Sequence, residues 1–169
     1  MPLSIDVYES RELQAVLLSI RRADRELRKQ IRQQTQRLLL PEWKKSLAEH
    51  ANTRLEHRVL VDTGRIKMSD QNVRMSSATV GRKLSGGLDP KTQAFAVEFG
   101  GDRSKKRTYE VSRGGKTWKV TRRTAAQLRP RRRNGYVVYP AAKQMIPRFA
   151  RLWVQTTVRT MHEAFEKRL

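Results

Sequence analysis

The stretch TYEVSRGGKTWKVT, residues 108–121, places two adjacent glycines between two segments of alternating side chains. A Gly-Gly pair suits the two-residue turns that join hairpin strands, because those turns require positive φ angles. Pairing the segments across this turn gives matching side chains on both faces, and a shift of one residue would lose that agreement. The sequence therefore predicts a β-hairpin with four cross-strand pairs: Arg113 with Lys116, Val111 with Trp118, Tyr109 with Val120, and Glu110 with Lys119.

The large side chains of the predicted hairpin share one face. Trp118 and Tyr109 lie there beside two valines, an arrangement typical of residues that pack into a core. Exposed aromatic rings on a basic hairpin would instead be platforms for stacked bases. We expect the core arrangement, and base stacking is the alternative.

Basic residues are concentrated around this hairpin. Residues 101–133 contain thirteen lysines and arginines against Asp102 and Glu110, a net charge of +11 out of the +21 carried by the 169-residue chain. This charge is typical of contact with DNA, RNA or an acidic protein, and a solvated arm without a ligand is the alternative. The residues expected to make phosphate or partner contacts are Arg113, Lys116, Arg122, Arg123, Arg129, Arg131, Arg132 and Arg133.

An arginine-rich run, RPRRRNGYVVYP, follows the hairpin at residues 129–140. Pro130 and the Asn134-Gly135 pair predict that its arginines lie in a loop. The apolar residues after them predict a short strand, Gly135–Tyr139. Because strands are expected on both sides of it, we interpret the run as a loop within the fold and not as a sorting signal.

The N-terminal third of the chain shows helical spacing of its apolar residues. Residues 10–40 predict one long helix, with Ser10 as its N-cap and a length of about 45 Å. Pro41 fits the first turn of a second helix over residues 42–60. Asp62-Thr63-Gly64 ends this region, with Gly64 expected in the left-handed conformation. The apolar side chains of the first helix that we expect in the subunit core or interface are Leu13, Leu17, Ile20, Leu27 and Ile31.

The rest of the chain predicts a small sheet and a C-terminal helix. Strands are expected at residues 73–80 and 94–99, with a loop at 82–90 between them. The chain is expected to be helical from Ala141, with Pro147 marking a kink or the true start of the helix after Gln144. The side chains expected to complete the core or interface from this helix are Phe149, Leu152, Trp153 and Phe165.

These segments together predict a single domain with an α+β fold. It comprises a helical region (1–60), a β-rich region with the hairpin (61–139) and a C-terminal helix (141–169). A long N-terminal helix and the C-terminal helix pack on a small antiparallel sheet, and the basic hairpin protrudes from it.

The composition argues against several classes of protein. There is no cysteine, so we expect neither disulfides nor a thiolate zinc site, which suits a reducing cytoplasm. No apolar run approaches the roughly 18 residues that a membrane span requires. The N-terminal residues lack the basic and apolar regions of a signal peptide. We therefore expect no membrane partner.

Residues for catalysis are also sparse. His50, His57 and His162 have no further ligand at a metal-binding spacing, although His50 and His57 could share a helix face. The carboxylates are scattered among basic residues and form no acid–base pair. We therefore expect no enzymatic activity, no metal and no cofactor.

Several short motifs occur in a suggestive order: VDTGRI at residues 61–66, AVEFG at 96–100, YPA at 139–141 and PRF at 147–149. In that order they resemble the small neck proteins of long-tailed bacteriophages, the head–tail connector or tail-completion family. The resemblance covers most of the chain, but the basic segment between Gly101 and Asn134 is longer than the usual pattern.

The resemblance implies a structural virion protein that forms a ring, a hexamer, at the head–tail junction. Such a ring is assembled in the cytoplasm of the bacterial host and contacts head-closure, adaptor and tail-terminator proteins. Double-stranded DNA passes through its lumen, and contact with that DNA would be independent of sequence. The alternative is a stand-alone basic protein that binds DNA or RNA directly, without catalytic activity.

Overall fold

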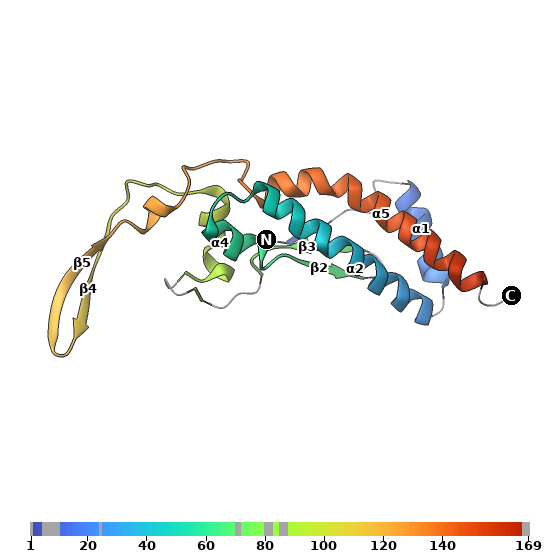
Figure 1. Ribbon diagram of the computed structural model, residues 1–169, viewed down its shortest axis with the longest axis horizontal. Helices are drawn as coiled ribbons and strands as arrows, with labels where there is room; N and C mark the ends of the chain where they lie inside the picture. The colour runs from blue at the N-terminus through green and yellow to red at the C-terminus, as the bar shows by residue number, and fades with distance from the viewer. Residues whose placement is uncertain are drawn as a thin grey trace.

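The computed structural model has an α+β fold, as the sequence predicted. It describes residues 2–4, 11–23, 25–69, 72–79, 83–84 and 88–166. Two long helices lie side by side and form most of an elongated body, and a β-hairpin projects from one end (Figure 1). The helical elements are α1 (Arg11–Arg22), α2 (Arg25–His50), α3 (Arg54–Glu56), the π-helix η2 (His57–Val61), α4 (Pro90–Phe99), the 3₁₀ helix η3 (Thr124–Gln127) and α5 (Val138–Glu166). The strands are β1 (Pro2–Ser4), β2 (Arg65–Met68), β3 (Val73–Ser76), β4 (Arg107–Arg113) and β5 (Lys116–Arg122).

The core lies between α2, α5 and the small sheet. Trp43 of α2 and Phe149 of α5 are fully buried and meet edge to face, with their ring centroids 6.5 Å apart. Farther along the helices, the Thr160 hydroxyl donates a hydrogen bond to the Gln34 side chain. Of the predicted core residues, Ile20, Ile31, Phe149 and Trp153 are buried, Leu27 and Leu152 are half-buried, and Phe165 is exposed.

The predicted N-terminal helix is interrupted, so the expectation of one continuous helix over residues 10–40 was wrong. α1 ends at Arg22 and α2 begins at Arg25. The break lets α1 pack against α5, where Val16 and Ile20 are buried. The burial of this apolar stripe outweighs the hydrogen bonds that a continuous helix would gain. The predicted N-cap Ser10 and the side chains of Leu13 and Leu17 lie outside the described residues.

Pro41 lies inside α2 and does not begin a second helix, which corrects the prediction for residues 42–60. Its ring is exposed, while Leu39, Trp43 and Leu47, spaced by four, are fully buried. Packing on both sides of the proline holds the helix together despite the missing backbone donor. The chain leaves α2 after His50 and turns through α3, whose N-terminus has a capping box of Thr53 and Glu56.

The three-stranded sheet is antiparallel, with the strand order β1-β3-β2. Its buried residues Ile66, Val73 and Met75 contribute to the core beside α2, and the Trp43 indole N–H donates to the Ser76 carbonyl at 3.2 Å. β3 confirms part of the strand predicted at residues 73–80, of which Val80 lies outside the described residues. Strand β2 was not predicted from the sequence.

Gly64 precedes β2 and does not have the positive φ that was expected of it. A side chain at this position would bring Cβ within 2.9 Å of the Leu47 side chain and 3.0 Å of the Val61 carbonyl. Close packing of the turn against α2, and not backbone conformation, explains the glycine.

The predicted strand at residues 94–99 is helix α4, so that expectation was wrong. Asp89 caps its N-terminus by accepting a hydrogen bond from the Lys91 N–H at 2.9 Å, and Pro90 occupies the first turn. Ala94 and Val97 are buried at helical spacing. A short apolar run fits both periodicities, and here the helix start signals decide.

The predicted strand Gly135–Tyr139 is also absent, because α5 begins at Val138. Pro140 lies in its first turn, where a missing N–H costs little. Pro147 lies inside the helix with its ring exposed and does not mark the helix start. The buried residues Ala141, Met145, Phe149 and Trp153 recur every four residues and hold the helix against α2. Within the described residues, no helix is both long and apolar enough to cross a membrane.

Candidate nucleic-acid interface

The hairpin has the register that the sequence predicted. β4 and β5 pair antiparallel, with Val111 opposite Trp118 and Glu110 opposite Lys119. Gly114 and Gly115 form the turn with φ angles of 59° and 76°, and no described residue lies within 4 Å of a Cβ built on either of them. These angles match the primed turn that favours glycine at both positions. We call residues 102–128 the arm.

The two faces of the arm differ in chemistry. One face, which we call the aromatic face, carries Tyr109, Val111, Trp118 and Val120. The opposite face is polar and paired within itself. Its cross-strand interactions are hydroxyl hydrogen bonds between Thr108 and Thr121 (2.8 Å) and between Ser112 and Thr117 (2.9 Å), and the facing charges of Glu110 and Lys119.

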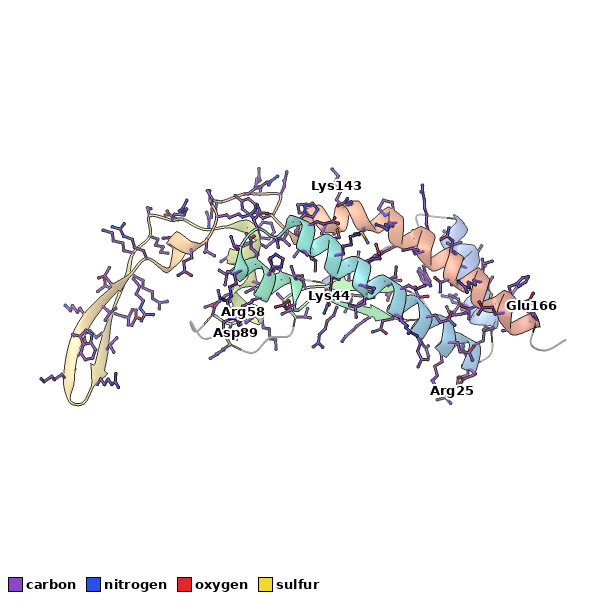
Figure 2. All side chains as sticks on the ribbon, in the orientation of Figure 1. Arg25, Lys44, Arg58, Asp89, Lys143 and Glu166 are labelled. Carbon is purple, nitrogen blue, oxygen red and sulfur yellow. The ribbon has the colours of Figure 1, made fainter. Side chains whose placement is uncertain are left out.

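The aromatic face is open, which corrects the expectation that Trp118 and Tyr109 belong to a core. Trp118 is 46% exposed and Tyr109 is 38% exposed, and the two valines are half-buried. The arm extends away from the helical body, and its side chains stand out on both sides (Figures 1 and 2). The alternating pattern shows which residues share a face, but it does not show whether another element covers that face.

Four cations surround the aromatic face. Alternation along the strands places Arg107 and Arg122 on this face at the base of the hairpin, and Arg113 and Lys116 at its tip. The guanidinium carbon of Arg122 lies 5.8 Å from the centre of the Tyr109 ring, within the range of a cation–π contact. The face therefore combines apolar rings with positive charge at each corner.

The two ends of the arm are held together by a short stem, which we define as Phe99–Gly101 and Arg129–Arg132. The Gly101 N–H donates to the Arg129 carbonyl at 3.0 Å, and the Arg132 N–H donates to the Phe99 carbonyl at 2.8 Å. Gly100 has a φ of 74°, and a Cβ on it would collide with the Pro130 carbonyl. The stem therefore holds together the points at which the chain leaves the helical body to form the arm and returns to it.

Arg129, one of the predicted contact residues, is held within the fold by an ion pair. Its guanidinium makes a two-point ion pair with the buried Glu56 carboxylate, with Nε–Oε1 at 2.7 Å and Nη2–Oε2 at 2.9 Å. The same carboxylate accepts the backbone N–H groups of Asn52 and Thr53. Arg129 therefore anchors the stem and is not placed to contact an external phosphate.

The three arginines that follow are exposed, but they are not equivalent. The Arg132 guanidinium lies over the Tyr136 ring at 5.3 Å, and Arg129 lies over the same ring at 4.6 Å. The Tyr136 hydroxyl donates to the Pro130 carbonyl at 2.8 Å and fixes the ring. Arg131 and Arg133, like Arg123 on the arm, are exposed.

The carboxylate of Asp102 forms the first turn of the arm. It accepts hydrogen bonds from the Ser104 hydroxyl at 2.6 Å and the Ser104 N–H at 3.0 Å. These bonds stabilise the ionised form and lower the pKa of the Asp102 carboxyl, and the nearby charges of Lys105 and Arg131 lower it further. The turn therefore keeps its negative charge to a lower pH than an ordinary aspartate would.

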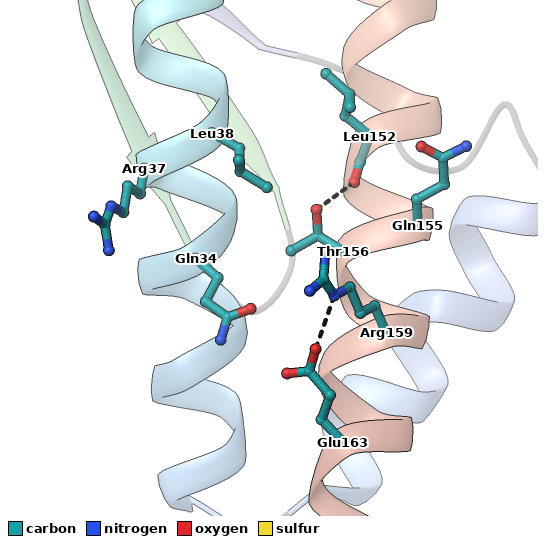
Figure 3. Close-up of a pocket in the computed structure, with 8 residues that line it drawn as sticks. All are labelled: Gln34, Arg37, Leu38, Leu152, Gln155, Thr156, Arg159 and Glu163. Atoms are coloured by element: carbon teal, nitrogen blue, oxygen red, sulfur yellow. Dashed lines mark hydrogen bonds and ion pairs between the residues drawn. The ribbon is translucent and has the colours of Figure 1, made fainter.

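A second feature is a shallow groove between α2 and α5 (Figure 3). Arg159 and Glu163 form an ion pair at 2.8 Å along one side, and the Thr156 hydroxyl donates to the Leu152 carbonyl. The groove contains no nucleophile–base pair of the kind that activates a catalytic hydroxyl. In the described ranges, no three His, Asp or Glu side chains come together in a way that could hold a metal ion. The groove is lined by Gln34, Arg37, Leu38, Leu152, Gln155, Thr156, Arg159 and Glu163.

Comparison of the chain with protein-family models, with curated proteins and with solved structures returned no match.

Proposed function

We propose that the protein is a structural component of the neck of a long-tailed bacteriophage, where it forms a ring that joins the tail to the head and lines the DNA channel. The observation that carries this proposal is the basic arm, held on a closed stem and projecting from a helical body. A ring would repeat this arm around its axis and create a positively charged passage. Contacts with the phosphates of double-stranded DNA in that passage would be independent of sequence.

Exposed apolar side chains support assembly with neighbouring subunits. Phe95 is 65% exposed and stacks on Phe99 at 4.4 Å, and Phe99 contacts Tyr139 at 5.4 Å. These three rings form an open aromatic cluster where α4 meets α5. Val158 and Phe165 of α5 are 59% and 66% exposed. A cluster of exposed apolar groups, such as the three rings, is typical of a protein interface.

The proposal assigns separate roles to the two parts of the molecule. The helical body would form the ring contacts, and the arm would reach into the lumen or toward the next ring. A six-fold ring, virion location, and contacts with head-closure, adaptor and tail-terminator proteins follow from the family resemblance. No catalytic step is part of the proposed role.

The test is the mass and shape of the purified protein. Light scattering coupled to size exclusion, with negative-stain imaging, is expected to show closed rings at micromolar concentration or on addition of a neighbouring neck protein. Phe95→Ser is expected to shift the population to monomers without loss of helix content, because the side chain is exposed. Lys116→Ala at the tip of the arm is the matched control and is expected to leave the rings intact. A monomer under all these conditions would contradict the proposal.

A stand-alone nucleic-acid-binding protein is the second candidate. It is favoured by the exposed cations of the arm, which require no ring to be accessible. This candidate predicts that a monomer binds DNA or RNA tightly, with an affinity that falls steeply with salt. The neck proposal predicts weak binding by the monomer and stronger binding by the ring.

A further inference from the structure

We infer that the aromatic face of the arm is a binding site for single-stranded nucleic acid, with unpaired bases stacked on Trp118 and Tyr109 and phosphates paired with the surrounding cations. The inference concerns the arm of a single chain and does not depend on ring formation.

The two rings are placed as separate platforms. Tyr109 lies opposite Val120 and Trp118 lies opposite Val111, so the rings are on different strands and offset by two residues. Diagonal neighbours of this kind lie roughly 7–8 Å apart. Each ring is more than one-third exposed, and each can therefore accept a base on its open side. Stacking of bases on aromatic rings is tolerant of sequence, because every base has a flat face.

The charge around the rings matches a backbone that passes between them. Arg107, Arg113, Lys116 and Arg122 stand at the corners of the face, and alternation places no acidic side chain on it. Glu110, the acid of these two strands, lies on the opposite face against Lys119. A phosphate on either side of a stacked base would therefore meet a cation and no repulsive charge.

This combination distinguishes unpaired bases from other anionic partners. In a duplex the base faces are already stacked on one another, so the rings could contact edges and backbone but not faces. An acidic peptide would neutralise the cations but would give the two rings no flat partner. The aromatic face of a second copy carries the same four cations, so two such faces would repel each other.

Trp118 provides a direct reporter of the site. The other two tryptophans, Trp43 and Trp153, are fully buried, so quenching of fluorescence by a bound base would come from Trp118. Titration of the full chain with an oligothymidylate of about 15 nucleotides is expected to give saturable quenching. An oligonucleotide of this length spans most of the site sizes known for similar stacking platforms. Anisotropy of a labelled oligonucleotide measures the affinity independently of the tryptophan.

The variants separate stacking from charge. Trp118→Ala is expected to weaken binding roughly 5- to 150-fold, the range for loss of one stacked base. Trp118→Phe keeps a ring and is expected to retain most of the affinity while it abolishes the fluorescence change. Thr117→Ala, on the polar face of the same strand, is the matched control and is expected to change affinity less than about twofold. Circular dichroism and the emission of the buried tryptophans check that each variant is folded.

Three other ligands test which chemical class of anionic partner the aromatic face binds. Duplex DNA of the same length, heparin and polyglutamate are compared with the oligothymidylate at the same salt concentration. The inference is supported if all three ligands bind more weakly than the oligothymidylate and if Trp118→Ala leaves their affinities unchanged. Equal or tighter binding of the duplex, heparin or polyglutamate, or an unchanged affinity of Trp118→Ala for the oligothymidylate, would overturn it. These measurements are independent of the mass of the assembly, so failure of this inference and failure of the ring proposal are distinguishable.

Discussion

The carboxylate of Glu98 caps the helix that begins at Val138, with its Oε2 2.9 Å from the backbone nitrogen of that residue. The same carboxylate accepts the N–H groups of Val137 and Tyr139, each at 3.1 Å. Glu98 is fully buried at the end of α4, so an acid from one helix satisfies the unpaired donors at the start of another. This contact joins α4 to α5 across 40 residues of chain that include the whole arm.

Substitution of Glu98 is expected to be among the most destabilising changes in the protein. Glu98→Ala removes the acceptor of three N–H groups, of which those of Val137 and Val138 are buried, at a cost of roughly 1–3 kcal/mol for each donor that water cannot reach. Glu98→Gln keeps one acceptor oxygen and is expected to cost less. Urea unfolding followed by circular dichroism measures both. An equal, small effect of the two variants would contradict the capping role.

The ion pair between Glu56 and Arg129 gives a second prediction, tested by a double-mutant cycle. Glu56→Ala is expected to cost roughly 3–5 kcal/mol, because it leaves a half-buried arginine unpaired and removes the capping box of α3. Arg129→Ala is expected to cost less, since Glu56 keeps its two backbone donors. A coupling energy of about 0.5–3 kcal/mol is expected. Strictly additive effects would show that the pair does not hold the stem.

Charge reversal in the arginine loop separates anchoring from binding. The double variant Arg131→Glu, Arg133→Glu is expected to unfold at the same urea concentration as the parent and to lose affinity for DNA, because both side chains are exposed. Arg129→Glu is expected to destabilise the fold, because it places two carboxylates together. Replacing all four arginines by glutamate, Arg129 included, would confuse these two effects. Unchanged DNA affinity of the double variant would exclude the loop from the interface.

Glycine substitutions at the stem and at the tip are expected to differ sharply. Gly100→Ala forces a Cβ against the Pro130 carbonyl at a positive φ, and a loss of more than about 2 kcal/mol is expected for such a backbone conflict. Gly114→Asn is the control, since the φ of Gly114 is also positive but, among the residues that the structure describes, none lies within 4 Å of the added Cβ. Asparagine tolerates this conformation in hairpin turns, so the midpoint of unfolding is expected to stay within error. Similar losses at both positions would indicate that conformation alone decides.

The hairpin could be predicted in detail because its determinants are local. The Gly114-Gly115 turn fixes which residues face each other, and the cross-strand pairs agree with that register. The α+β class followed similarly from the spacing of apolar residues. The covering of each face could not be predicted, because it depends on where the rest of the chain lies. For this reason Trp118 was expected in a core and is exposed.

The errors arose where a distant residue decides local structure. Residues 94–99 and 135–139 are short apolar runs that fit a strand, but Glu98 in the first caps a helix that begins in the second. Pro41 was expected to begin a helix, and Pro147 to mark a kink or the start of one. Both lie inside helices, because α2 and α5 pack against each other along their length. The anchoring role of Arg129 could not be distinguished from the expected binding role of the neighbouring arginines, because its partner Glu56 lies 73 residues earlier in the chain.

The stem has a consequence for how such a protein can change. Backbone hydrogen bonds between Phe99–Gly101 and Arg129–Arg132 hold the two ends of the arm together. The arm can therefore lengthen, shorten or change composition without moving the helices. The helical body and the arm are therefore free to diverge at different rates. One helical body could carry arms of different length and charge, each adapted to a different ligand, while the contacts of the helical body stay the same.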